Sequence, residues 1–167
     1  MSHPFKIRPA SLTTSDDTLL LDFQESQIPW LTANGGAGQW GTESIRLTRP
    51  DSALKTRAWI TKSQRQSPWG SGDWCRAYIA EAEDGTPVGG LVLEDKAAGY
   101  VRGVLPEQDA GDAFVYLTYL ISNRGAGEKA RGVGRVLIER AGVEARGVGV
   151  RRVCLDCYRG NERRLVR

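Results

Sequence analysis

A glycine-rich segment joins a strand-like run to an amphipathic helical run, and it constrains the fold more than any other part of the chain. Residues 114–122 are rich in β-branched and aromatic side chains, which is typical of a buried strand. From Gly132 to Gly147, apolar residues recur at helical spacing, and charged residues occupy the other face. The chain must therefore pass from a strand into a helix through a turn with little side-chain bulk.

This turn has the chemistry of an anion-binding site. The first N–H groups of a helix have no partner within the helix, and the helix dipole is positive at that end. A pyrophosphate can accept several hydrogen bonds there, provided that no Cβ blocks its approach to the backbone. The segment 129–135, which we call the anion cradle, combines two glycines with basic side chains. Its residues are Lys129, Ala130, Arg131, Gly132, Val133, Gly134 and Arg135.

The remaining patterns predict a mixed sheet with helices packed on it, an α/β (α+β) fold. Turn residues such as Asp84 and Gly85 separate two strand runs, which predicts a hairpin. The run 96–111 fits either an edge strand around residues 100–105 or a longer irregular loop. The predicted elements are strands at 5–8, 74–82, 87–93, 114–122 and 153–158, helices at 16–28, 50–66 and 132–147, and a loop at 30–44.

Composition narrows the functional classes. The 167 residues fit one domain, 1–167, and a net charge of +3 is too small to indicate a nucleic-acid binder. The three cysteines are odd in number and come without partner histidines, since His3 is the only one, so we expect no metal. No apolar run is long enough to span a membrane and no signal peptide is visible, so we expect a cytoplasmic protein.

Lys129, Gly132 and Gly134 resemble the signature of the GNAT (GCN5-related) N-acetyltransferase family. In that signature an Arg or Gln, two residues, a Gly, one residue and then Gly or Ala follow a central strand. The loop between Ile121 and Lys129 is longer than is usual in the family. The order of the surrounding elements also matches, and the segment 161–166 resembles the start of the family's next helix.

The resemblance implies a GNAT-type mixed, mostly antiparallel sheet flanked by helices, with acetyl-CoA as acyl donor. Main-chain groups of Tyr119, Leu120 and Ile121 would bind pantetheine where their strand splays from the strand after it. Asn161 matches the family asparagine that contacts the pantetheine arm, and the anion cradle would bind the pyrophosphate. The expected reaction is direct attack of a primary amine on the thioester in a ternary complex, and the amine is expected to belong to a small molecule.

The expected general acid is missing. In many family members it is a tyrosine seven residues after the asparagine. Counted from Asn161, that position falls one residue beyond Arg167. We therefore expect the C-terminal helix and the last strands to be missing or truncated, or supplied by another chain. The exposed sheet edge that this would leave predicts a homodimer. Tyr116 and Asp156 are the candidate catalytic residues on the strands, with Asp112 or a water chain as alternatives for the base.

Two other functions are compatible with the sequence. A noncatalytic acyl-CoA-binding or interaction domain would also keep the anion cradle. A nucleotide or RNA binder is disfavoured, because residues 125–129 do not form a Walker motif and the basic residues are not interleaved with aromatic ones. Trp30 and Trp40 bracket the loop at 30–44, so they either pack in the core or line a pocket.

Overall fold

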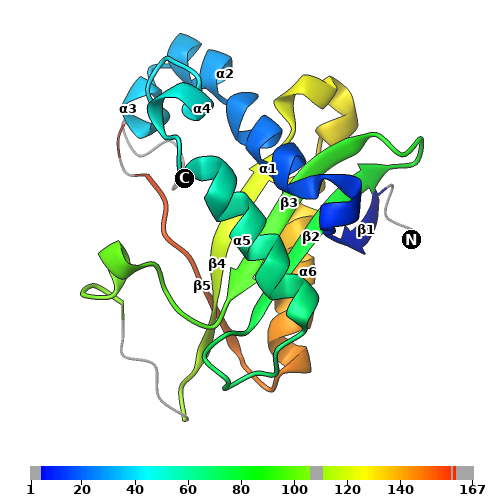
Figure 1. The fold of residues 1–167 in the computed structure, drawn as a ribbon, viewed down its shortest axis with the longest axis vertical. Coiled ribbons are helices and arrows are strands. Elements are labelled where there is room, and N and C mark those ends of the chain that lie inside the picture. The colour runs from blue at the N-terminus through cyan, green and yellow to red at the C-terminus, as the bar shows by residue number, and fades with distance from the viewer. Residues whose placement is uncertain (1–4, 106–110, 159, 161–167) are drawn as a thin grey trace.

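A mixed β-sheet forms the centre of the molecule (Figure 1). The computed structural model describes residues 5–105, 111–158 and 160. Within them the strand order is β1-β2-β3-β4-β5. The pairs β1–β2, β2–β3 and β3–β4 are antiparallel and the pair β4–β5 is parallel, which confirms a mixed, mostly antiparallel sheet. The strands are β1 (Phe5–Pro9), β2 (Cys75–Ala82), β3 (Pro87–Glu94), β4 (Phe114–Ser122) and β5 (Arg152–Cys154).

Helices cover both faces of this sheet (Figure 1). Helices α1 (Asp16–Glu25) and α5 (Ser52–Arg65) pack on one face, where Phe23 and Ile60 meet Ile79 of β2 in a buried cluster. Helix α6 (Val133–Gly147) packs on the other face, where Leu137 meets Leu91 of β3. The described residues also include η1 (Leu12–Thr14), η2 (Gly99–Val101) and η3 (Arg124–Ala130), and the short helices α2 (Ile28–Ala33), α3 (Ala37–Trp40) and α4 (Ile45–Thr48).

The segment between α1 and α5 differs from the prediction of one helix at 16–28 and a loop at 30–44. Helix α1 ends at Glu25, and Pro29 lies in the first turn of α2, where its missing N–H costs no helical hydrogen bond. The predicted loop contains α3 and part of α2, and α4 begins directly after it. Its apolar anchors are Ile28 and Ile45, which pack with Leu21 in a small buried cluster. Tertiary burial stabilises helices that are too short to persist alone.

The predicted strand at 153–158 is too long. Strand β5 contains Arg152–Cys154 only, and its last residue pair is Cys154 with Tyr116 of β4. The alternation of side chains through Cys157 indicates an extended chain, but a strand also needs a hydrogen-bonded neighbour. The run 96–111 contains η2 and no strand in its described part.

A β-bulge interrupts the pairing between β3 and β4. Val92 lies opposite Tyr119 and Leu93 lies opposite Leu117, so Thr118 is the extra residue on β4. Its hydroxyl donates to Glu94 Oε2 at 2.8 Å, and the Lys62 ammonium on α5 donates to Oε1 of the same carboxylate at 2.9 Å. The Glu94 carboxylate on β3 therefore connects the bulge to α5 by hydrogen bonds.

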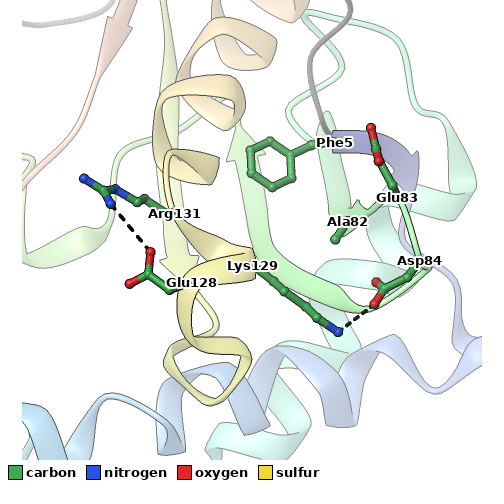
Figure 2. A pocket seen from close by; sticks show the side chains of 7 residues that line it. All are labelled: Phe5, Ala82, Glu83, Asp84, Glu128, Lys129 and Arg131. Atoms are coloured by element: carbon green, nitrogen blue, oxygen red, sulfur yellow. Dashed lines mark hydrogen bonds and ion pairs between the residues drawn. The ribbon is translucent and has the colours of Figure 1, made fainter.

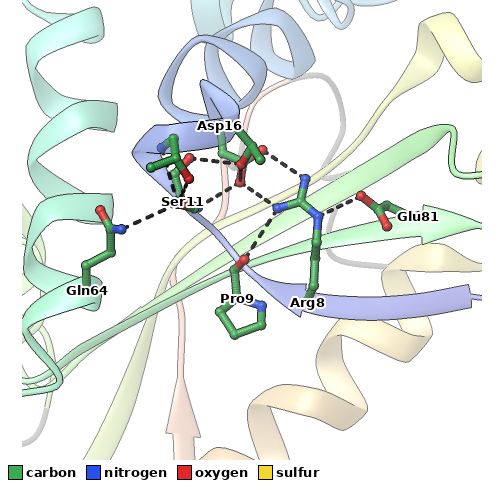
Figure 3. A network of polar contacts seen from close by, with 8 residues as sticks. Arg8, Pro9, Ser11, Asp16, Gln64 and Glu81 are labelled. Carbon is green, nitrogen blue, oxygen red and sulfur yellow. Dashed lines mark hydrogen bonds and ion pairs between the residues drawn. The ribbon is translucent and has the colours of Figure 1, made fainter.

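A network around Asp16 joins β1, α1 and β2 (Figure 3). The Arg8 guanidinium donates to both carboxylate oxygens of Asp16, at 2.6 and 3.0 Å, and to Glu81 Oε1 at 2.6 Å. The Ser11 N–H and the Thr14 hydroxyl also donate to Asp16 Oδ2. Burial of the Asp16 side chain disfavours its charge, but these hydrogen bonds outweigh burial and hold the pKa of Asp16 below its ordinary value.

Candidate functional site

Within the described residues, the edge of β4 that faces β5 is open over most of its length. The parallel pairing of β4 with β5 ends at Tyr116 and Cys154. Beyond that point β4 pairs with β3 on one side, and no described strand pairs with it on the other. The chain after β5 runs away from β4 towards α3 (Figure 1), where a Cβ on Gly38 would lie 2.4 Å from the Tyr158 hydroxyl oxygen. Backbone N–H and C=O groups of residues 117–122 that do not pair with β3 face this open edge.

From the end of β4, η3 leads the chain into the anion cradle and α6. Gly132 is the N-cap of α6 with φ of 85°, a left-handed conformation that favours glycine. A Cβ built at Gly132 or Gly134 has no other atom within 4 Å, so the space above the first turn of α6 is accessible. Ala130 and Val133 are buried against the core, and they fix the first turn of the helix to the sheet. The first N–H groups of α6 have no partner within the helix.

The basic side chains of the anion cradle are paired with carboxylates. Lys129 Nζ lies 2.6 Å from Asp84 Oδ2 and 3.2 Å from the Thr86 hydroxyl, in the turn between β2 and β3. Hydrogen bonds from Lys129 and Thr86 hold the pKa of Asp84 below its ordinary value. The other two pairs are Arg131–Glu128, at 3.6 Å, and Arg135–Glu139, at 2.9 Å. Such exposed pairs are weak, so the cations can exchange partners when an anion binds.

A pocket of about 420 Å³ lies beside the cradle, between the start of β1, the β2–β3 turn and the loop before α6 (Figure 2). It has an aromatic wall formed by Phe5. Its charged residues are three acids and two bases, and the Lys129–Asp84 and Arg131–Glu128 pairs lie within it. The pocket itself is therefore not selective for anions. Its lining residues are Phe5, Ala82, Glu83, Asp84, Glu128, Lys129 and Arg131.

The side chains of Tyr119 and Ile121 are committed to the core. Tyr119 donates its hydroxyl to the Leu20 carbonyl at 2.6 Å, and its ring packs edge-on against Trp59. Burial raises the pKa of the Tyr119 phenol far above its ordinary value. Leu120 points to the α6 side of the sheet and is half-buried. The contact of these residues with pantetheine through main-chain groups stays a prediction.

The two candidate catalytic residues meet at the point where β4 and β5 separate. The Tyr116 hydroxyl donates to Asp156 Oδ1, and the Tyr100 hydroxyl donates to Oδ2 at 3.0 Å. Tyr116 is buried while Asp156 is exposed. Burial, together with the Asp156 carboxylate, raises the pKa of Tyr116, so this phenol stays protonated and acts as a hydrogen-bond donor. No local sequence pattern marks Tyr100, because only the fold of residues 96–105 brings it to Asp156.

The two tryptophans of the predicted loop have different environments. Trp40 is partly buried and packs against the clusters around α1 and α5. Trp30 on α2 is 40% exposed, and the Arg124 guanidinium carbon lies 3.8 Å from the centre of its ring.

Asn161, the expected pantetheine contact, lies outside the described residues. Within the described residues, no helix is both long and apolar enough to cross a membrane.

Known structures share this architecture at low sequence identity. No protein-family model matches the chain, and no curated protein is significantly similar to it in sequence. A GNAT-family acetyltransferase from Listeria monocytogenes aligns with a TM-score of 0.61 at 18% identity, over 95% of this chain and 79% of that chain. A GCN5-related N-acetyltransferase from Ralstonia eutropha gives 0.58 at 18% identity, over 92% and 83%. A predicted acetyltransferase from Clostridium acetobutylicum, solved with acetyl-CoA, gives 0.56 at 15% identity, over 92% and 80%. The fold of this chain is therefore that of the GNAT acetyltransferases.

Proposed function

We propose that residues 1–167 form an N-acetyltransferase domain that transfers the acetyl group of acetyl-CoA to a primary amine of a small molecule. The observation that carries this proposal is the continuity between the open edge of β4 and the glycine turn that starts α6. Pantetheine would bind along β4 as an additional strand, and the pyrophosphate would bind the N–H groups of Gly132 to Gly134. The shared fold with an acetyl-CoA complex supports the same assignment.

The reaction would proceed in a ternary complex. The amine nitrogen attacks the thioester carbonyl carbon, the C–S bond breaks, and the sulfur leaves as the thiol of CoA. A backbone N–H near Leu120 and Ile121 would stabilise the negative charge that develops on the carbonyl oxygen. The amine must lose a proton, and the leaving thiolate must gain one.

We assign the proton acceptor to Asp156. It is exposed at the end of the β4–β5 pairing, beside the open edge of β4. Tyr116 and Tyr100 each donate to one of its oxygens, which fixes the orientation of the carboxylate. Tyr116 is a positioning residue in this scheme, because its raised pKa makes the hydroxyl a donor that keeps its proton.

Isothermal titration calorimetry with acetyl-CoA tests the binding step, with Gly134→Leu as the disrupting variant. The leucine side chain would occupy the accessible space above the first turn of α6, so we expect roughly a tenfold or greater loss of affinity. Gly147→Leu is the matched control, since Gly147 lies at the other end of α6 and its Cβ would also meet no atom within 4 Å. Equal affinity of both variants would refute the proposed cofactor site.

Turnover separates the enzyme from a noncatalytic acyl-CoA-binding domain, because both functions predict binding. Release of free CoA thiol, measured with a panel of primary amines, would establish the transferase. Binding of acetyl-CoA without thiol release in the presence of any amine would favour the noncatalytic function.

We also propose a homodimer that forms through the outer edge of β5, the last strand of the described sheet.

A further inference from the structure

An arginine with a fixed orientation lies at the end of β4, between α2 and the loop that leads to α6. Arg124 is the first residue of η3. Its guanidinium stacks on the Trp30 ring at 3.8 Å, and its Nε donates to Gln27 Oε1 at 2.8 Å. Its backbone N–H donates to the Ser26 hydroxyl at 3.1 Å. The stacking and the Nε hydrogen bond together define the plane of the guanidinium.

The partner of Arg124 is itself held in place. Gln27 Nε2 donates to the carbonyl of Ser122, the last residue of β4, at 2.7 Å. It also lies within hydrogen-bond distance of the Phe23 carbonyl, at 3.2 Å, and of the Ser26 hydroxyl, at 3.0 Å. The amide is therefore oriented with its oxygen towards Arg124. A guanidinium that is oriented before a ligand arrives loses little conformational entropy when the ligand binds.

The charge of Arg124 has no acidic partner among the described residues. The neighbouring cations of the anion cradle, in contrast, each pair with a carboxylate. Partial burial lowers the pKa of Arg124, but a guanidinium remains charged at neutral pH. Both Arg124 and Trp30 remain exposed, so the terminal nitrogens of the guanidinium are accessible to a ligand.

We propose that Arg124, held on the Trp30 ring, binds an anionic group of a ligand at the end of the open edge of β4. Phosphate and carboxylate match the fork of the guanidinium, because each can accept two parallel N–H hydrogen bonds. The anion has two sources near this site: a phosphate of acyl-CoA, or an acidic group on the acceptor amine. The choice of these two sources rests on the proposed function. Direct binding measurements test the anion site at Arg124 and need no turnover.

The test compares the wild type with Arg124→Gln in titrations with four kinds of probe. Inorganic pyrophosphate and acetyl-CoA carry phosphates, and S-acetylpantetheine is the acyl donor without them. Glycine and glycinamide, together with other amino acids and their amides, are amines with and without a carboxylate. Quenching of Trp30 fluorescence reports binding directly at this site. The fluorescence that is lost in Trp30→Phe is the contribution of Trp30 to the total signal.

Arg57→Gln is the matched control for charge. Arg57 on α5 is an exposed arginine at 3.2 Å from Asp17, so its removal changes the net charge by the same amount without affecting the Trp30 stack. Arg124→Lys keeps the charge but loses the planar fork, and we expect an intermediate affinity. Thermal unfolding of each variant shows whether a loss of binding reflects a loss of fold.

The expected result is a loss of roughly ten- to a hundredfold in affinity for one class of probe in Arg124→Gln, the effect of a charged hydrogen bond. Loss for pyrophosphate and acetyl-CoA, but not for S-acetylpantetheine, would assign the anion to the cofactor. Loss for the amino acids, but not for their amides, would assign it to the acceptor.

Two results would overturn the inference. One is equal binding of every probe by the wild type and Arg124→Gln, including no binding by either. The other is an equal loss in Arg57→Gln. If pyrophosphate binding depends on Arg124 while acetyl-CoA does not bind, the inference stands and the proposed function fails. If acetyl-CoA binding depends on Gly134 but no probe depends on Arg124, the function stands and the inference fails.

Discussion

The Tyr116 hydroxyl donates a hydrogen bond to the Asp156 carboxylate, and this contact joins a buried side chain of β4 to the chain that follows β5. It lies immediately beyond the last β4–β5 residue pair, which is Tyr116 with Cys154. The contact therefore occurs where the two strands separate. It orients a carboxylate at the open edge on which the proposed reaction depends.

Asp156→Asn should lower kcat by about a hundredfold while the affinity for acetyl-CoA stays unchanged, since a positioned base typically contributes at least this factor. Steady-state kinetics with thiol detection and calorimetry with acetyl-CoA measure the two quantities. Tyr100→Phe is the control, because it removes only the second hydrogen bond to the same carboxylate. A kcat of Asp156→Asn equal to that of the wild type would exclude Asp156 as the base.

Tyr116→Phe should lower kcat less than Asp156→Asn does, because it leaves the proton acceptor in place and removes one of the groups that orient it. A comparison of kcat with KM separates this role from packing: loss of a hydrogen-bond donor that orients Asp156 should lower kcat and leave the KM for acetyl-CoA unchanged. A kcat equal to that of the wild type would leave Tyr116 as a core residue only.

Gly90→Ala should destabilise the fold by about 1–3 kcal/mol through overpacking. A Cβ at Gly90 would lie 2.5 Å from Leu20 Cδ2 and 3.2 Å from the Tyr119 ring, and Leu20 is fully buried. Urea unfolding measures the change in the free energy of unfolding. Gly99→Ala is the control, because its Cβ would meet no atom within 4 Å. Equal stabilities of the two variants would contradict the close packing of α1 on β3.

Asp16→Asn should cost about 3 kcal/mol or more at pH 7, because it leaves the partly buried Arg8 without its main partner. The pKa of Asp16 is lowered in the folded state, so its contribution is present above the unfolded value near 3.8 and is lost as the pH falls through the folded value. The stability difference between wild type and Asp16→Asn, from urea unfolding across pH 2 to 7, should therefore shrink at acidic pH. A constant difference would show that Asp16 acts by shape alone.

The homodimer is tested by size-exclusion chromatography with light scattering. The outer edge of β5 is free in the described sheet, and an unpaired edge can pair with a second chain. We expect the mass of two chains at micromolar concentration. A stable monomer would contradict the dimer and would leave the proposed acetyl-CoA site unaffected.

The local patterns of the sequence were sufficient for the main elements and for the glycine turn that starts α6. The strand 114–122 and the helix from 132 to 147 follow from periodicity and turn chemistry, which depend on neighbouring residues, and the structure confirms both. The same holds for the hairpin of β2 and β3. The Arg135–Glu139 and Arg140–Glu144 pairs on α6 also follow from helical spacing alone.

Only the tertiary structure decided where distant segments meet. The end of β5 at Cys154, the Tyr100 contact with Asp156, and the Arg124 stack on Trp30 each join residues far apart in the chain. Part of α2 and all of α3 lie where a loop was predicted, and burial of Ile28 and Ile45 against Leu21 stabilises this segment. Local propensity determines which segments can become helix or strand, but the partners of an edge, a carboxylate or a guanidinium depend on the packing of the whole sheet and its helices.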